Sequence, residues 1–194
     1  MRKNKRSEEK LALRLGTLVV TEGFTQSLTR PLTSSFSGEG FTVESLNPLV
    51  WFDMDVSMLA AGDVAAAEGD LVATLENKVS GGPNATQTTS TEQSVAKIPT
   101  DGNQPYLLMD IVDDEYEFTT GSSAINGTIV VGTLEGTYSA NISLSASTQY
   151  DLQARGVSST ANAGFLKNVI GYLITPTQLS DSQVTNIEAY FVNK

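Results

Sequence analysis

The stretch TYSANISL at residues 137–144 decides the fold. Its apolar side chains alternate without a break with Thr, Ser and Asn, the apolar set being Tyr138, Ala140, Ile142 and Leu144. Successive side chains of a β-strand point to opposite faces, so a period of two residues predicts a strand with one buried and one solvated face. Because the buried face needs a second layer to cover it, we expect an all-β antiparallel sandwich.

Apolar segments on both sides of this stretch predict further strands, separated by segments rich in Gly, Ser, Thr and Asn. The densest is residues 49–54, which holds the only Trp, and we expect Trp51 in the core rather than exposed as a platform for a sugar ring. Residues 60–70 fit one turn of helix or a loop. The other expected strands are 71–79, 106–112, 115–119 and 164–175, with 106–119 also compatible with one strand bent at Asp113 and Asp114.

The end of the chain predicts one α-helix over residues 179–193. Ser180 followed by Gln183 has the spacing of a capping box, in which each residue satisfies a backbone N–H of the first helical turn. Apolar residues then recur at helical spacing, at Val184, Ile187 and Phe191. We therefore expect a sandwich domain with a C-terminal helix at 47–194, preceded by an N-terminal arm with short strands at 1–46 that serves as an anchor.

Composition excludes most catalytic chemistry. The chain contains no Cys and no His, which removes disulfides, thiolate metal sites, Ser-His-Asp and Cys-His catalysis and histidine zinc sites. We therefore expect a protein that is not an enzyme. No apolar run approaches the ~20 residues of a membrane span, and Glu8, Glu9 and Lys10 interrupt the apolar part that a signal peptide needs, so neither a membrane nor export is expected.

Charge divides the chain into a basic start and an acidic remainder. Residues 1–14 hold six basic and two acidic side chains, a net charge of +4, whereas the remaining 6 basic and 20 acidic residues of the total of 12 and 22 give −14. An acidic body repels nucleic acid, which is not an expected partner. The basic run is either a solvated tail or an anchor. The anchor residues would be Arg2, Lys3, Lys5, Arg6, Lys10, Leu11, Arg14 and Leu15.

The densest acidic cluster offers two kinds of chemistry. Carboxylates on a loop suit Ca²⁺, although no EF-hand spacing is present, and the same residues also suit capping of backbone N–H groups in a turn. The candidate metal ligands are Asp110, Asp113, Asp114 and Glu115. Asp113, Glu115 and Glu117 alternate along an expected strand, so they could also place carboxylates on one face as in a glycosidase. No cofactor is required by any other feature.

Four stretches in order resemble motifs of concanavalin A-like and laminin-G-like jelly-roll domains, which occur in phage structural proteins and bacterial surface proteins. The stretches are PLVWFD at 48–53, ENKVSGGPNATQ at 76–87, LMDIVDD at 108–114 and LSDSQVTNIEAY at 179–190. Together they cover about residues 47–193. The resemblance implies a shortened jelly roll, because fewer residues than usual separate the Asp-Asp turn from the closing helix. Ile111 stands in that turn where the family has Gly.

The resemblance and the charge pattern together favour a structural protein of a phage virion, a capsid-decorating or tail component assembled in the host cytoplasm. Its N-terminal arm would dock on other virion proteins while the lectin-like sandwich is displayed, and a homo-oligomer is expected. The alternative is a carbohydrate-binding module of a bacterial surface system that recognises a host glycan. The aromatic platform of such a module would come from Tyr106, Tyr116, Tyr138, Tyr150 and Tyr172. A glycosidase is the third hypothesis.

Overall fold

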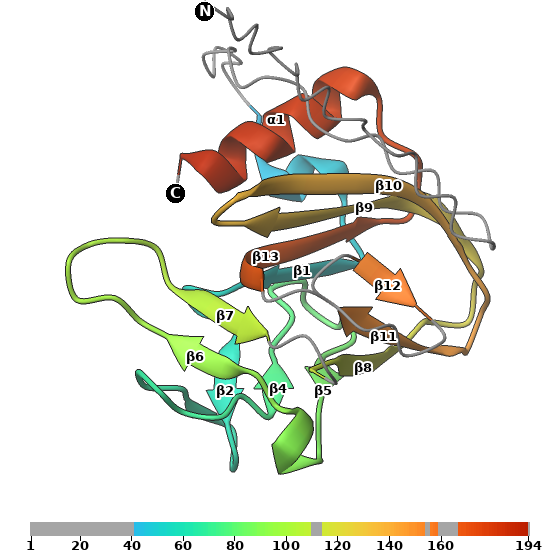
Figure 1. Ribbon diagram of the computed structural model, residues 1–194. Helices are drawn as coiled ribbons and strands as arrows, with labels where there is room; N and C mark the ends of the chain where they lie inside the picture. The colour runs from blue at the N-terminus through green and yellow to red at the C-terminus, as the bar shows by residue number, and fades with distance from the viewer. Residues whose placement is uncertain (1–40, 110–113, 154–155, 159–166, 194) are drawn as a thin grey trace, which may run out of the picture.

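The computed structural model describes residues 41–109, 114–153, 156–158 and 167–193. Within these ranges two antiparallel sheets pack face to face, and one α-helix, α1 (Asp181–Val192), lies on the outer face of the larger sheet (Figure 1). The prediction of a β-sandwich with a C-terminal helix is confirmed. The basic arm lies outside the described residues. No described helix is long and apolar enough to cross a membrane.

The larger sheet holds more residues because its strands are longer; it has six strands and is organised around a long central strand. Its strands are β1 (Val50–Asp53), β6 (Val95–Lys97), β7 (Tyr106–Met109), β9 (Ile125–Thr133), β10 (Gly136–Leu144) and β13 (Lys167–Thr175). One edge of β13 pairs with β9, which in turn pairs with β10, and the other edge pairs first with β7 and then with β1. This central position explains why β13 is a nearly continuous apolar run, since side chains on both of its faces are buried.

The smaller sheet has seven strands and is more irregular. Its strands are β2 (Met58–Ala60), β3 (Val64–Ala65), β4 (Thr74–Leu75), β5 (Ala85–Thr86), β8 (Tyr116–Thr119), β11 (Gln149–Gln153) and β12 (Gly156–Ser158), arranged in the order β12-β11-β8-β5-β4-β2-β3. Short 3₁₀ helices at Val43–Leu46 and Ser90–Glu92 complete the described elements.

The main core lies between the two sheets. Phe52 and Tyr172 enter it from the larger sheet, and Tyr116 and Phe118 enter it from the smaller sheet, each with no more than 2% of its surface exposed. The alternation that predicted β10 is confirmed, because its apolar set faces this core. The buried Tyr116 hydroxyl donates to the Val72 carbonyl oxygen at 2.9 Å, so a polar atom in the core is satisfied.

A second core lies between the outer face of the larger sheet and α1. Ile187 and Phe191 of the helix pack on Trp51 and Leu173, and residues of the first 3₁₀ helix close the side of this cluster. The predicted capping box is confirmed, because Ser180 Oγ accepts from the backbone of Gln183 and the Gln183 side chain accepts from the backbone of Ser180.

Phe191 is seated on a pair of glycines. Gly132 of β9 and Gly171 of β13 are paired across the sheet, and a Cβ atom on either would lie 2.5 Å from a carbon of the Phe191 ring. Two adjacent positions without a side chain therefore form the hollow that admits a large ring to the sheet surface. The register shifts between Val169 and Gly171, a bulge that places Ile170 in the same cluster.

The structure decides between the alternatives expected for two segments and shortens the strand expected in a third. Residues 60–70 form turns around the two-residue strand β3 and no helix, since the segment pairs back on β2. Within residues 71–79 only β4 is a strand, because Asn77 and Lys78 bond to Trp51 of β1 instead of continuing in the smaller sheet. Segments 106–112 and 115–119 contain two separate strands, β7 and β8, which belong to different sheets.

Candidate functional site

Strand β1 delivers a charge to the interface between the larger sheet and α1. Its residues alternate, so Val50 and Phe52 face the main core while Trp51 and Asp53 face the helix side. Asp53 is 2% exposed and is the one buried charged residue of the described part of the chain. An ionised carboxylate at such a position needs charged or hydrogen-bonding partners, and its surroundings supply both.

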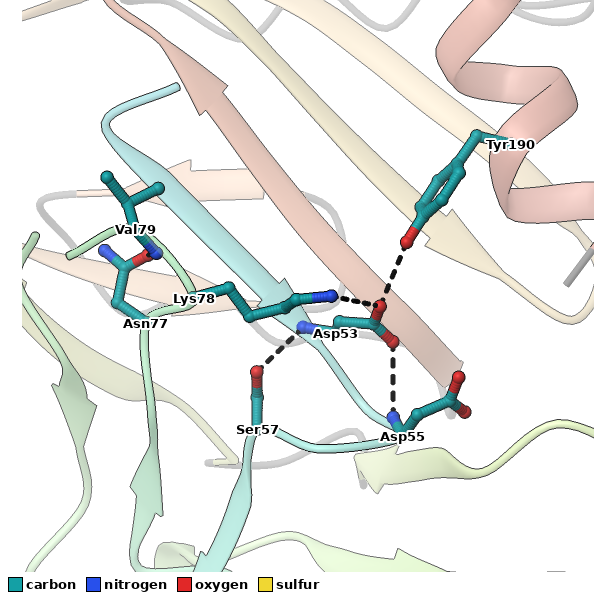
Figure 2. Close-up of polar contacts among 7 residues, drawn as sticks. All are labelled: Asp53, Asp55, Ser57, Asn77, Lys78, Val79 and Tyr190. Carbon is teal, nitrogen blue, oxygen red and sulfur yellow. Dashed lines mark hydrogen bonds and ion pairs between the residues drawn. The ribbon is translucent and has the colours of Figure 1, made fainter. Parts of the chain in front are cut away.

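Both carboxylate oxygens of Asp53 are engaged (Figure 2). Oδ2 accepts from Lys78 Nζ at 3.2 Å and from the Tyr190 hydroxyl at 3.0 Å, and Oδ1 accepts from the Asp55 backbone N–H at 3.3 Å. The backbone N–H of Asp53 donates to Ser57 Oγ at 2.9 Å. The carboxylate thus joins β1, the loop that carries Lys78, and the last turns of α1.

The loop around Lys78 is fixed to β1 by the side chain of Asn77. Asn77 Oδ1 accepts from the backbone N–H groups of Trp51 and Val79, both at 3.0 Å, while its Nδ2 donates to the Leu49 carbonyl oxygen at 3.0 Å. The Lys78 N–H adds a bond to the Trp51 carbonyl oxygen at 3.0 Å. The side-chain amide of Asn77 therefore makes the hydrogen bonds that a neighbouring strand would make with this edge of β1, and it positions Lys78 next to Asp53.

Trp51 and Tyr190 enclose the ion pair. Lys78 Nζ lies 3.9 Å from the centre of the Trp51 ring, a cation–π contact, and the rings of Trp51 and Tyr190 meet edge to face at 6.2 Å. Burial, followed by the neighbouring Asp53 carboxylate, raises the pKa of Tyr190 well above its ordinary value. The hydroxyl therefore keeps its proton and acts as a donor to Asp53.

We name Trp51, Asp53, Lys78 and Tyr190 the Asp53 cluster. An ammonium group, a phenol and a backbone N–H of the protein itself occupy the oxygens of this carboxylate. The arrangement is well suited to fasten the C-terminal helix to the sheet. The Asp53 cluster therefore acts as a clamp, because it holds α1 and the loop of Lys78 to β1.

Three of the four stretches that resemble the jelly-roll family meet in this cluster. Stretch 48–53 supplies Trp51 and Asp53, stretch 76–87 supplies Lys78, and stretch 179–190 supplies Tyr190. These residues could not be paired from the sequence, because contacts between positions 25 and 137 residues apart leave no local periodic signal.

The candidate metal ligands are only partly described. Asp110 and Asp113 lie outside the described residues, as do all the predicted anchor residues of the arm. Asp114 and Glu115 directly precede β8 and are half-buried. Glu115 Oε2 accepts from Gln153 Nε2 at 3.2 Å. Among the described residues no group of three or more acidic side chains is arranged to hold a metal ion.

The outer face of the smaller sheet is acidic. Glu117 of β8 is exposed and pairs across the sheet with Asp151 of β11. Partial burial, and then repulsion from Glu115 and Glu117, raises the pKa of Asp151 from 3.8 to about 6. A raised pKa on a carboxyl group beside other carboxyl groups is a pattern also found in general acids, so this face is a candidate for carboxylate chemistry.

The tyrosines expected for a sugar platform pack into the cores instead. Tyr116 and Tyr172 are fully buried, Tyr138 and Tyr150 lie against the main core, and Tyr106 lies against the helix-side core. Trp51 is 6% exposed, which confirms its prediction as a core residue. None of these six aromatic residues stands on the acidic face.

Comparison with protein families, with characterised proteins and with solved structures gives no match to this chain.

Proposed function

We propose that this chain is a non-catalytic structural protein of a virus particle, a capsid-decorating or tail component, that docks on other virion proteins through its N-terminal arm and displays the sandwich. The observation that carries the non-catalytic part is the Asp53 cluster. The one buried carboxylate of the described body is committed to holding the helix on the sheet. A protein that builds an assembly needs such a rigid body more than it needs a reactive group.

The distribution of charge supports docking through the arm. Residues 1–40 hold 7 basic and 4 acidic side chains, a net charge of +3. Residues 41–194 hold the remaining 5 basic and 18 acidic ones, a net charge of −13. Two of the five basic residues of the body, Lys78 and Lys97, are already paired with acidic side chains. Attraction to an acidic partner is therefore concentrated in the arm, where opposite charge also speeds association.

The proposal is tested on particles purified from an infected host whose virus encodes this chain. Mass spectrometry should detect the chain in a fixed ratio to the major capsid or tail protein. Deletion of residues 1–16 should leave the thermal melt of the isolated protein unchanged and remove the chain from the particles. A matched control replaces Arg2, Arg6 and Arg14 with Lys, which keeps the charge and should keep incorporation.

Two results would contradict the proposal. Absence of the chain from washed particles would refute a virion role. Normal incorporation of the chain lacking residues 1–16 would refute docking through the arm while leaving a virion role intact.

The acidic face favours one second candidate, glycoside hydrolysis. It rests on Asp151, whose raised pKa of about 6 beside Glu115 and Glu117 resembles the paired acid and base of glycosidases. The test is release of reducing ends from a panel of polysaccharides, with Glu115→Gln, Glu117→Gln and Asp151→Asn compared with the unchanged chain. Hydrolysis that all three substitutions leave intact would come from a contaminant, and this candidate would be lost.

A further inference from the structure

Strand β10 is an unusually long strand for the edge of a sheet. It spans Gly136–Leu144 and pairs with β9 at all nine positions without a register shift. Among the described residues its only strand partner is β9, so its second edge presents a row of backbone N–H and C=O groups. The other strands at sheet edges, β1, β6, β12 and β3, have four, three, three and two residues.

β10 also lacks the features by which proteins protect an edge strand. Where no helix or loop covers them, edges are normally blocked by a short strand, a charged side chain, a proline or a bulge. β10 has a regular ladder, and residues 136–150 contain no Asp, Glu, Lys, Arg or Pro. Within the described residues, an edge of this length without such features is a template for pairing with another strand.

Charge identifies the strand that fits this edge. Bodies of net charge −13 repel one another, so two copies can approach closely only where acidic residues are absent. Residues 118–134 and 136–150, which include β9 and β10, form the longest neutral region of the body, interrupted only by Glu135 in the turn. A neutral edge on an acidic chain therefore suits a second copy of the same chain.

The backbone register makes β10 self-complementary. Gly136 pairs with Thr133 across a two-residue turn, so this pair belongs to the hydrogen-bonded set, and hydrogen-bonded pairs alternate along an antiparallel ladder. The N–H and C=O groups of Ser139 and Asn141 therefore point away from β9. If β10 pairs with its own copy through these groups, odd positions meet odd positions, and the apolar set of each strand stays on the core side.

We infer that β10 is a self-pairing strand, which joins the larger sheets of two copies into one continuous antiparallel sheet across a two-fold axis. Every residue near the axis meets a residue of the same strand, so any charge there would oppose itself. The neutrality of residues 136–150 removes that cost. This inference goes beyond the proposed role in a particle and does not depend on it.

Light scattering coupled to size-exclusion chromatography of the full chain tests the inference. The unchanged chain should have twice the 20.6 kDa mass of one copy, and dissociation on dilution should be suppressed by added salt, because salt screens the repulsion between acidic bodies. Ser139→Pro removes an outward N–H without removing a bond to β9, and it should halve the mass. Ser139→Thr keeps the N–H and should leave the mass unchanged.

A second variant keeps the test decisive if the proline disturbs folding. Ser139→Lys brings like charges to the axis and should also yield single copies, whereas Gln149→Lys, with the same charge change on β11, should leave the dimer intact. A single-copy mass for the unchanged chain at every concentration would overturn the inference. So would a dimer that survives Ser139→Lys, or a dimer that forms only after residues 1–40 are deleted, since the edge would then be covered by the chain itself.

Discussion

Gly132→Ala tests whether α1 is held by the fit of Phe191 into the sheet. The new Cβ would lie 2.5 and 2.8 Å from two atoms of the Phe191 ring and 3.0 Å from Ile170, where ordinary contacts between carbons are about 3.5–4 Å. The ring must therefore move by about 1 Å. Overpacking of this kind costs about 1–3 kcal/mol, and replacing Gly by Ala in a strand returns about 0.5–1 kcal/mol.

The expected net loss in the free energy of unfolding is about 1–2 kcal/mol, measured by urea denaturation at constant slope. Gly121→Ala is the matched control, because its Cβ would meet nothing within 4 Å, and its effect should stay within about 0.5 kcal/mol. In the Phe191→Ala background the clash is absent, so Gly132→Ala should become neutral or stabilising. Equal losses in both backgrounds would refute the proposed seat for the ring.

Three further predictions concern polar groups. Tyr190→Phe keeps the ring but removes a hydrogen bond to the buried Asp53 carboxylate, and urea denaturation should show a loss of about 1.5–3 kcal/mol; a loss below about 0.5 kcal/mol would contradict the clamp. Asp151 has a pKa raised to about 6 in the fold, so its ionisation destabilises the protein as the pH rises through 6. Asp151→Asn should therefore raise the melting temperature above pH 6 and leave it unchanged below pH 3.8. A gain in melting temperature that is equal at both pH values would refute repulsion from Glu117 and its neighbours. Ser180→Ala removes the cap of α1 and should cost about 1 kcal/mol, whereas an unchanged melting curve would show that packing alone holds the helix.

Local signals in the sequence predicted the elements of this fold well. The alternation in β10, the apolar density of β1 and the capping box at Ser180 each arise from neighbours within a few residues, and each prediction is confirmed. The same signals could not predict which of the two sheets each strand joins. Strands β7 and β8 are adjacent in sequence but lie in different layers, because their partners are distant segments.

The Asp53 cluster lay beyond such signals for the same reason. Nothing near Asp53 in the sequence shows that a lysine and a tyrosine from two remote segments reach its carboxylate. The acidic sequence cluster suggested a site at Asp110, Asp113, Asp114 and Glu115. The structure places Asp151, a residue from another strand, beside Glu115 and Glu117. A cluster of charges in the sequence identifies only the residues that one segment contributes to a site, and it misses those that other strands contribute.

The two interactions proposed for this chain have opposite electrostatic character, which allows them to be separated in one assembly. Contact through the basic arm attracts an acidic partner and should weaken as salt rises, whereas pairing through β10 joins two acidic bodies and should strengthen. A particle assembled through both would lose the arm contact first in high salt and release the protein as dimers. Release of the protein as single copies in high salt would contradict self-pairing through β10, while leaving docking through the arm unaffected.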